Sequence, residues 1–104
     1  QLTQEEHMAF VVAAIWKAKE GEEHRVEETI RTMTPLSRAE EKNLYYQAQV
    51  SPTDPRTFFL YEQYTDEAGY EEHKATPHFQ ENVFGYIIEY LEERQVSTYE
   101  TIDV

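Results

Sequence analysis

Two residues could carry out proton transfer, and both lie in residues 58–79, which read FFLYEQYTDEAGYEEHKATPHF. His73 can accept or donate a proton near neutral pH, so it is our first candidate for a general base. Glu62 lies in a run of bulky residues, where alternation places it on one strand face with three large apolar side chains. A carboxylate in that position needs a partner. We expect Glu62 to orient His73, to act as the base itself, or to pair with a backbone amide or an arginine.

The elements that would position these residues are a strand and a short helix. The aromatic and branched residues at 58–64 favour a strand. Asp66 suits the N-cap of a helix, and Glu67 suits its positive end. The helix is expected to run to about Ala75, because Pro77 disfavours helical geometry in the residue before it. Strand and helix together bring four polar side chains near one another, namely Glu62, Tyr64, Tyr70 and His73.

The same stretch resembles the signature of the antibiotic biosynthesis monooxygenase superfamily, whose members are dimeric α+β barrels. The resemblance is carried, in type and spacing, by Tyr61, Glu62, Tyr64, Asp66, Glu67, His73, Thr76, Pro77, His78 and Phe79. Asn43 and Tyr46 also match the superfamily's Asn-x-x-Tyr at the second strand, although Lys42 stands where a glycine is usual. The chain is most similar to the small single-domain branch of quinol monooxygenases and autoinducer-2-phosphate isomerases.

This resemblance implies a cofactor-independent monooxygenase that oxidises a small aromatic, quinol-like substrate with O2. In this hypothesis His73 takes a proton from the substrate, and Glu62 orients His73. The pocket would be formed by Trp16, Asn43, Tyr46, Tyr64, His78 and Phe79. Packing alone would also account for Tyr46, and a surface position at a helix start would account for His78.

Two other functions are compatible with the sequence. An isomerase of a small phosphorylated hydroxy-ketone would need the same acid and base, together with cations that bind the phosphate. The candidate phosphate-binding cations are Lys17, Lys19, Arg25, Arg38 and Lys42. They do not form a clear cluster in the sequence. A non-catalytic dimeric binding protein is the third hypothesis, because a fold does not determine a function.

No metal or organic cofactor is expected. His73 and His78 are five residues apart, with a proline between them. Two metal ligands on one face of a helix are usually four residues apart, and no third ligand is evident.

The chain has no cysteine, and its three glycines do not form a nucleotide-binding loop. At the positions that bind haem in the haem-degrading branch of the superfamily, this chain has Ala14, Tyr64 and Val83 in place of Asn, Trp and His.

Length and charge narrow the function classes further. The 104 residues suggest a single domain, which we place at residues 8–104 after an N-terminal tail at 1–7. A net charge of −12 argues against binding to nucleic acid or to an anionic membrane surface. No apolar run approaches the roughly 20 residues of a membrane helix, and the polar, acidic start is unlike a secretory signal. Without cysteines or a targeting signal, we expect a cytoplasmic protein.

The spacing of apolar residues along the rest of the chain, taken with residues 58–79, predicts the order β-α-β-β-α-α-β. The predicted elements outside 58–79 are strands at 8–19, 43–51 and 95–104 and helices at 22–34 and 79–91, with Pro35 ending the first helix. This order is that of the ferredoxin-like split βαβ fold, in the α+β class. The strand at 8–19 is apolar on both faces, so it should be covered on both sides. We therefore expect a homodimer in which the sheets of two copies pack together.

Overall fold

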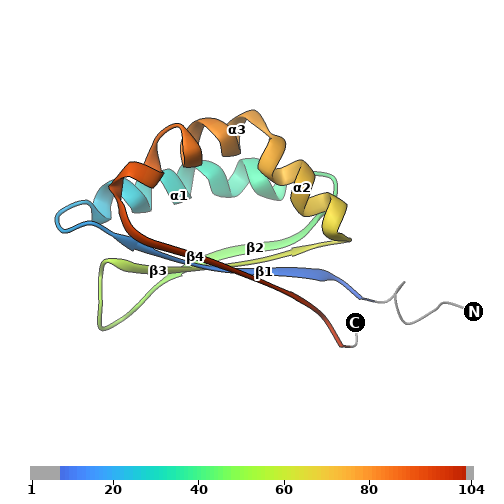
Figure 1. Cartoon of the computed structure of the whole chain (residues 1–104). Helices are drawn as coiled ribbons and strands as arrows, with labels where there is room; N and C mark the ends of the chain where they lie inside the picture. The colour runs from blue at the N-terminus through green and yellow to red at the C-terminus, as the bar shows by residue number, and fades with distance from the viewer. Residues whose placement is uncertain (1–7, 103–104) are drawn as a thin grey trace, which may run out of the picture.

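The chain folds into one four-stranded sheet, and all of the described helices lie on the same face of it (Figure 1). The structure is a computed structural model that describes residues 8–102, so the predicted tail at 1–7 lies outside the described residues. The elements in chain order are β1 (Phe10–Ala18), α1 (Glu23–Arg38), β2 (Asn43–Val50), β3 (Thr57–Tyr64), α2 (Glu67–Ala75), α3 (Pro77–Phe79), η2 (Gln80–Phe84), η3 (Ile87–Tyr90) and β4 (Leu91–Glu100).

The strand order is β2-β3-β1-β4, and every neighbouring pair is antiparallel. This confirms the predicted ferredoxin-like α+β fold. β1 occupies an inner position because it is apolar on both faces. On its helix side, Val12, Ala14 and Trp16 are buried in the core. On the opposite side, Ile15 is exposed, because no described element covers that face of the sheet (Figure 1).

Helix α1 continues past Pro35, where the sequence predicted that it would end. It runs to Arg38, and the N–H of Ala39 donates to the carbonyl of Pro35. A proline inside a helix removes the hydrogen bond to the carbonyl four residues earlier, here that of Arg31. Arg31 is exposed, so water can replace the lost donor. The extra turn makes a tertiary contact, because Nε of Arg38 donates to the carbonyl of Tyr46 on β2 at 2.9 Å.

The segment after α2 departs most from the prediction. Instead of one helix over 79–91, the chain forms the short helix α3, the π-helical turn η2 and the 3₁₀ turn η3. Part of the predicted apolar face is nevertheless buried. Its buried residues are Phe79, Val83, Ile87 and Leu91. Leu91 belongs to β4, which begins four residues before the predicted strand because β1 is long enough to pair with it to Ala18. The last two residues of the predicted strand 95–104 lie outside the described part of the chain.

Helix α2 forms as predicted. The Asp66 side chain accepts a hydrogen bond from the backbone N–H of Gly69 at 2.9 Å, which is an N-cap. Thr76 then separates α2 from α3, and its hydroxyl accepts from the N–H of Phe79 at 3.2 Å. This break redirects the chain between His73 and His78. Within residues 8–102, no helix has the length and hydropathy that crossing a membrane requires.

Candidate active site

The helix side of the sheet carries a buried group of polar side chains beneath α2. In the sheet register, Glu62 on β3 lies between Tyr46 on β2 and Val12 on β1. His73, in the last turn of α2, is only 1 % exposed. Its ring centre lies 5.5 Å from that of Tyr64 and 6.0 Å from that of Tyr46. The strand–helix pair predicted from sequence therefore brings Glu62 and His73 into one core.

Glu40, in the turn between α1 and β2, binds both histidines. Its Oε2 lies 2.8 Å from Nδ1 of His73 and 2.6 Å from Nε2 of His78. A carboxylate only accepts hydrogen bonds, so both ring nitrogens donate. His73 is buried, whereas Glu40 and His78 are partly exposed. The three side chains thus form a continuous hydrogen-bonded path from the core to the surface.

Glu62 lies on the other side of the His73 ring. Its Oε1 accepts a hydrogen bond from the Tyr64 hydroxyl at 2.6 Å. The same oxygen lies 3.8 Å from Nε2 of His73, which is too long for a hydrogen bond but close for two ionisable groups. Burial raises the pKa of Glu62, and the charge of His73 and the Tyr64 hydrogen bond oppose this shift. A carboxyl group with a raised pKa beside an imidazole is suited to proton exchange.

The buried tyrosines of the site are donors and not bases. Burial raises the pKa of Tyr46, Tyr64 and Tyr70, and the negative charge of Glu62 raises each of them further. Their hydroxyl groups therefore stay protonated at neutral pH. In this core, His73 and Glu62 are therefore the side chains that can abstract a proton.

A small cavity of about 10 Å³ lies between the sheet and the helices. It is lined by Val12, Ala14, Trp16, Met33, Tyr46, Leu60, Glu62, Tyr70, His73, Phe79, Arg94 and Val96. A volume of this size holds about one water molecule. An aromatic ligand can therefore bind here only if part of the lining moves.

The predicted pocket residues occupy three kinds of position. Trp16, Tyr46 and Phe79 line the cavity together with Glu62 and His73. Tyr64 contributes through its hydrogen bond to Glu62, and His78 through Glu40. Asn43 is not among the lining residues, and its amide nitrogen donates to the carbonyl of Tyr45 at 3.2 Å.

Sequence reasoning missed two residues of this site, Glu40 and Arg94. Glu40 lies in a polar connector, 33 residues before His73, and nothing in that spacing predicts contact. Arg94 lies on β4 opposite Trp16, so it faces the helix side of the sheet. A correct start for β4 and its register with β1 would have placed Arg94 on this face.

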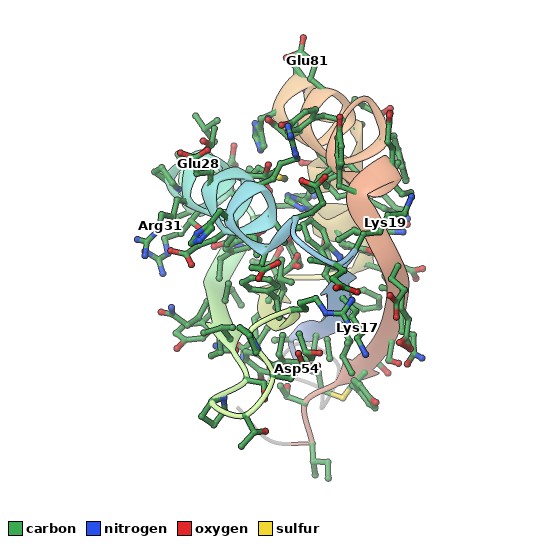
Figure 2. All side chains as sticks on the ribbon, turned by 90° about the vertical axis from the view of Figure 1, so that its left-hand side faces the viewer. Lys17, Lys19, Glu28, Arg31, Asp54 and Glu81 are labelled. Atoms are coloured by element: carbon green, nitrogen blue, oxygen red, sulfur yellow. The ribbon has the colours of Figure 1, made fainter. Side chains whose placement is uncertain are left out.

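The five cations considered for phosphate binding all lie away from the cavity. Lys17 and Lys19 lie at the surface in Figure 2, and Lys17 is 4.0 Å from Asp54. The other three bind elsewhere, namely Arg25 to Glu22, Arg38 to the carbonyl of Tyr46 and Lys42 to Glu72. None of the five lines the cavity. The lining gives no support to a phosphorylated substrate from these residues.

Glu40, His73 and His78 also meet the distance requirement for a metal site. One ligand atom from each lies within 4.8 Å of the others. Two histidines and one carboxylate are a donor set that divalent transition metals accept. The expectation of no metal rested partly on the lack of a third ligand, and Glu40 supplies one. The same three groups also satisfy one another without an ion, because both imidazoles donate to one carboxylate.

The comparisons with known proteins agree with this fold. The sequence profile of the antibiotic biosynthesis monooxygenase family matches residues 8–83, which is well over half of the chain. The chain belongs to this family. Among curated proteins, no significant match is found.

The same fold is found in solved structures of other proteins. The crystal structure of PA3566 from Pseudomonas aeruginosa has a TM-score of 0.85 and 25 % identity, covering 92 % of this chain and 96 % of that one. The protein SO0527 from Shewanella oneidensis has a TM-score of 0.85 and 26 % identity, with coverage of 97 % and 95 %. A structure described as an antibiotic biosynthesis monooxygenase has a TM-score of 0.79 and 24 % identity, with coverage of 91 % and 98 %.

Glu62 gives a testable pH dependence of stability. Its pKa in the folded protein is raised above the ordinary value of 4.5, so folding favours the protonated form. The stability that this carboxyl contributes is therefore fully present below about pH 4.5 and is lost as the pH rises through the folded pKa. In Glu62→Gln the side chain is always neutral. We expect its free energy of unfolding to increase relative to that of the wild type as the pH rises above this value.

Urea unfolding between about pH 4 and pH 8 measures this difference. Glu28→Gln is the matched control, because Glu28 is exposed on the outer side of α1 (Figure 2). The control should follow the wild type at every pH. A constant difference between Glu62→Gln and the wild type across the range would show that the Glu62 pKa is the same in the folded and unfolded chain.

Proposed function

We propose that this protein is a cofactor-independent monooxygenase that oxidises a small aromatic, quinol-like substrate with O2. One observation carries the proposal: a buried imidazole and a buried carboxyl, His73 and Glu62, line an internal cavity whose other walls, apart from Arg94, are aromatic and aliphatic. Membership of the antibiotic biosynthesis monooxygenase family supports oxygenation as the reaction. The buried side chains of His73 and Glu62 support proton removal as the contribution of the protein.

The chemistry needs no outside reductant. His73 takes the proton of the substrate hydroxyl, which leaves an electron-rich anion that can transfer electrons to O2. A carbon–oxygen bond forms on the ring, and the oxygen–oxygen bond then breaks. The substrate gains one oxygen atom and loses two hydrogens, while the second oxygen atom leaves as water. All four electrons taken up by O2 come from the substrate.

The surroundings of His73 suit this role. Nε2 of His73 faces Glu62 at the cavity, while Nδ1 donates to Glu40. A proton received at Nε2 can be balanced by release from Nδ1 to Glu40, which is partly exposed and can pass the proton to water. Glu40 also holds the imidazole ring in one orientation, which favours proton transfer. The walls of Trp16, Tyr46 and Phe79 exclude water from the reacting anion.

The partner we propose is a second copy of this chain, bound to the open face of the sheet. Large apolar side chains are exposed there, including Ile15, Leu44, Tyr45 and Phe59. A shallow hollow on this face is lined by Leu44, Tyr45, Gln49, Phe59, Tyr61 and Gln63. None of these six residues is charged, so the net charge of −12 does not oppose self-association at this surface.

The function is tested by oxygen uptake. Purified protein is mixed with a panel of hydroquinones and naphthols, and the consumption of O2 and the mass of the product are measured. Incorporation of one atom from labelled O2, dependent on protein, supports the proposal. A panel without any uptake would favour the second candidate, a non-catalytic dimeric binding protein. The small size of the closed cavity is the observation that supports that candidate.

Chelation tests the independence from metal. We expect oxygen uptake to be unchanged, within about twofold, after the protein is dialysed against EDTA, because the three possible ligands satisfy one another by hydrogen bonds. Metal content is measured in parallel by elemental analysis. Activity that disappears on chelation and returns with Fe²⁺ or Cu²⁺ would assign a metal to Glu40, His73 and His78 instead.

A further inference from the structure

The cavity reaches the surface at one strand. Ten of its twelve lining side chains are buried, and the two that are not, Arg94 and Val96, both belong to β4. β4 is an edge strand of the sheet. A ligand that enters the cavity without disturbing the buried lining therefore passes between β4 and the helix layer, beside Arg94.

Arg94 has a buried donor without an acceptor. Its Nε is buried and makes no hydrogen bond, and no carboxylate of residues 8–102 lies within ion-pair distance of its guanidinium. A buried donor without an acceptor destabilises the folded protein, and a charged donor does so more strongly. The guanidinium lies 5.5 Å from the ring of Phe84, which is itself half-exposed. Phe84 is thus an aromatic neighbour of the guanidinium and leaves the Nε donor unsatisfied.

The charge of Arg94 acts on groups inside the cavity. It lowers the pKa of Glu62 and of Tyr70, against the larger opposite effect of burial on each. Arg94 is also the only arginine or lysine among the lining residues. In a protein with a net charge of −12, this places a single positive charge beside the buried acid and base.

We propose that Arg94 binds the ionised oxygen of a phenolic substrate, and that this contact selects phenolates over neutral aromatic compounds. The inference rests on the proposed function, in which a hydroxyl group loses its proton to His73. A guanidinium that donates through Nε and a terminal nitrogen matches such an oxygen well. The cavity then has a proton acceptor at α2 and an anion-binding group at β4. Burial of the phenolate satisfies the free Nε donor.

The test uses 4-nitrophenol, which resists oxidation and whose ionised form absorbs visible light. Its affinity for the protein and the pKa of the bound probe are measured by absorbance, with nitrobenzene as the neutral ligand of similar shape. Trp16 is the single tryptophan and lines the cavity, so quenching of its fluorescence reports nitrobenzene binding there. We expect the wild type to bind 4-nitrophenolate more tightly than nitrobenzene.

Arg94→Gln should weaken binding of 4-nitrophenolate by about tenfold or more and raise the pKa of the bound probe, while nitrobenzene affinity changes by less than about twofold. Arg94→Lys should recover part of the loss, because it keeps the charge. Arg31→Gln is the control, since Arg31 is exposed on α1 (Figure 2). Thermal unfolding of each variant checks that the fold is kept.

Two results would overturn the proposal: equal affinity of Arg94→Gln and the wild type for 4-nitrophenolate, or no preference of the wild type for the anion over nitrobenzene. The binding assay involves no turnover, so its outcome is separate from that of the proposed function. Loss of anion selectivity in Arg94→Gln, together with no oxygen uptake on any substrate, would retain the anion site and reject the oxygenase.

Discussion

Replacing His73 by asparagine is expected to lower the rate of oxygen uptake by about 10²–10⁴-fold, which is the usual contribution of a general base. The asparagine amide nitrogen takes the place of Nδ1 and can still donate a hydrogen bond to Glu40, but the amide cannot accept a proton at neutral pH. The expected loss is therefore chemical and is not a consequence of removing the Glu40 contact. The measurement is kcat/KM for a substrate that the wild type oxidises, followed with an oxygen electrode.

Two further variants give this result its meaning. His24→Gln should retain wild-type activity, because His24 is exposed on α1 and far from the proposed chemistry. His78→Gln should have an intermediate effect, because the hydrogen bond from His78 helps to hold Glu40, which in turn orients His73. Full activity in His73→Asn, with its fold intact by circular dichroism, would exclude His73 as the base and transfer that role to Glu62.

Placing a carboxylate at the centre of the open sheet face is expected to separate the proposed dimer into monomers. Phe59 lies on that face, where it pairs with Ile15 across β3 and β1, and it is 40 % exposed in the single chain. In a sheet-to-sheet dimer the side chain would be buried, and Phe59→Asp would bury an unpaired charge in its place. The loss of a central contact residue costs at least about 2 kcal/mol, which raises the dissociation constant about 30-fold.

The oligomeric state is measured by analytical ultracentrifugation across a range of protein concentrations. Leu36→Asp is the matched control, since Leu36 is 46 % exposed but lies on α1, in the helix layer. It should leave the assembly of the wild type unchanged. A monomeric wild type, or a Phe59→Asp variant that dimerises as tightly as the wild type, would rule out this face as the interface.

Local sequence signals predicted those parts of the fold that depend on local physics. Asp66 caps α2 because a side-chain oxygen can reach the N–H of a residue three positions later, whatever lies elsewhere. The apolar residues on both faces of β1 predicted cover on both sides, and the single chain covers the helix side, where Val12, Ala14 and Trp16 are buried. Pro35 misled the prediction, because its local preference to end a helix was outweighed by a tertiary contact of the last turn, in which Arg38 donates to the carbonyl of Tyr46.

The same distinction between local and long-range contacts holds for the site. The sequence by itself determined that Glu62 and His73 would lie close, because they belong to a strand and a helix joined by a short capped turn. Only the tertiary structure decided that Glu40 binds His73 and that Arg94 borders the cavity. Those contacts depend on how the turn after α1 and the edge strand β4 pack against elements far along the chain. Such packing is set by the whole core and leaves no spacing or motif in the sequence.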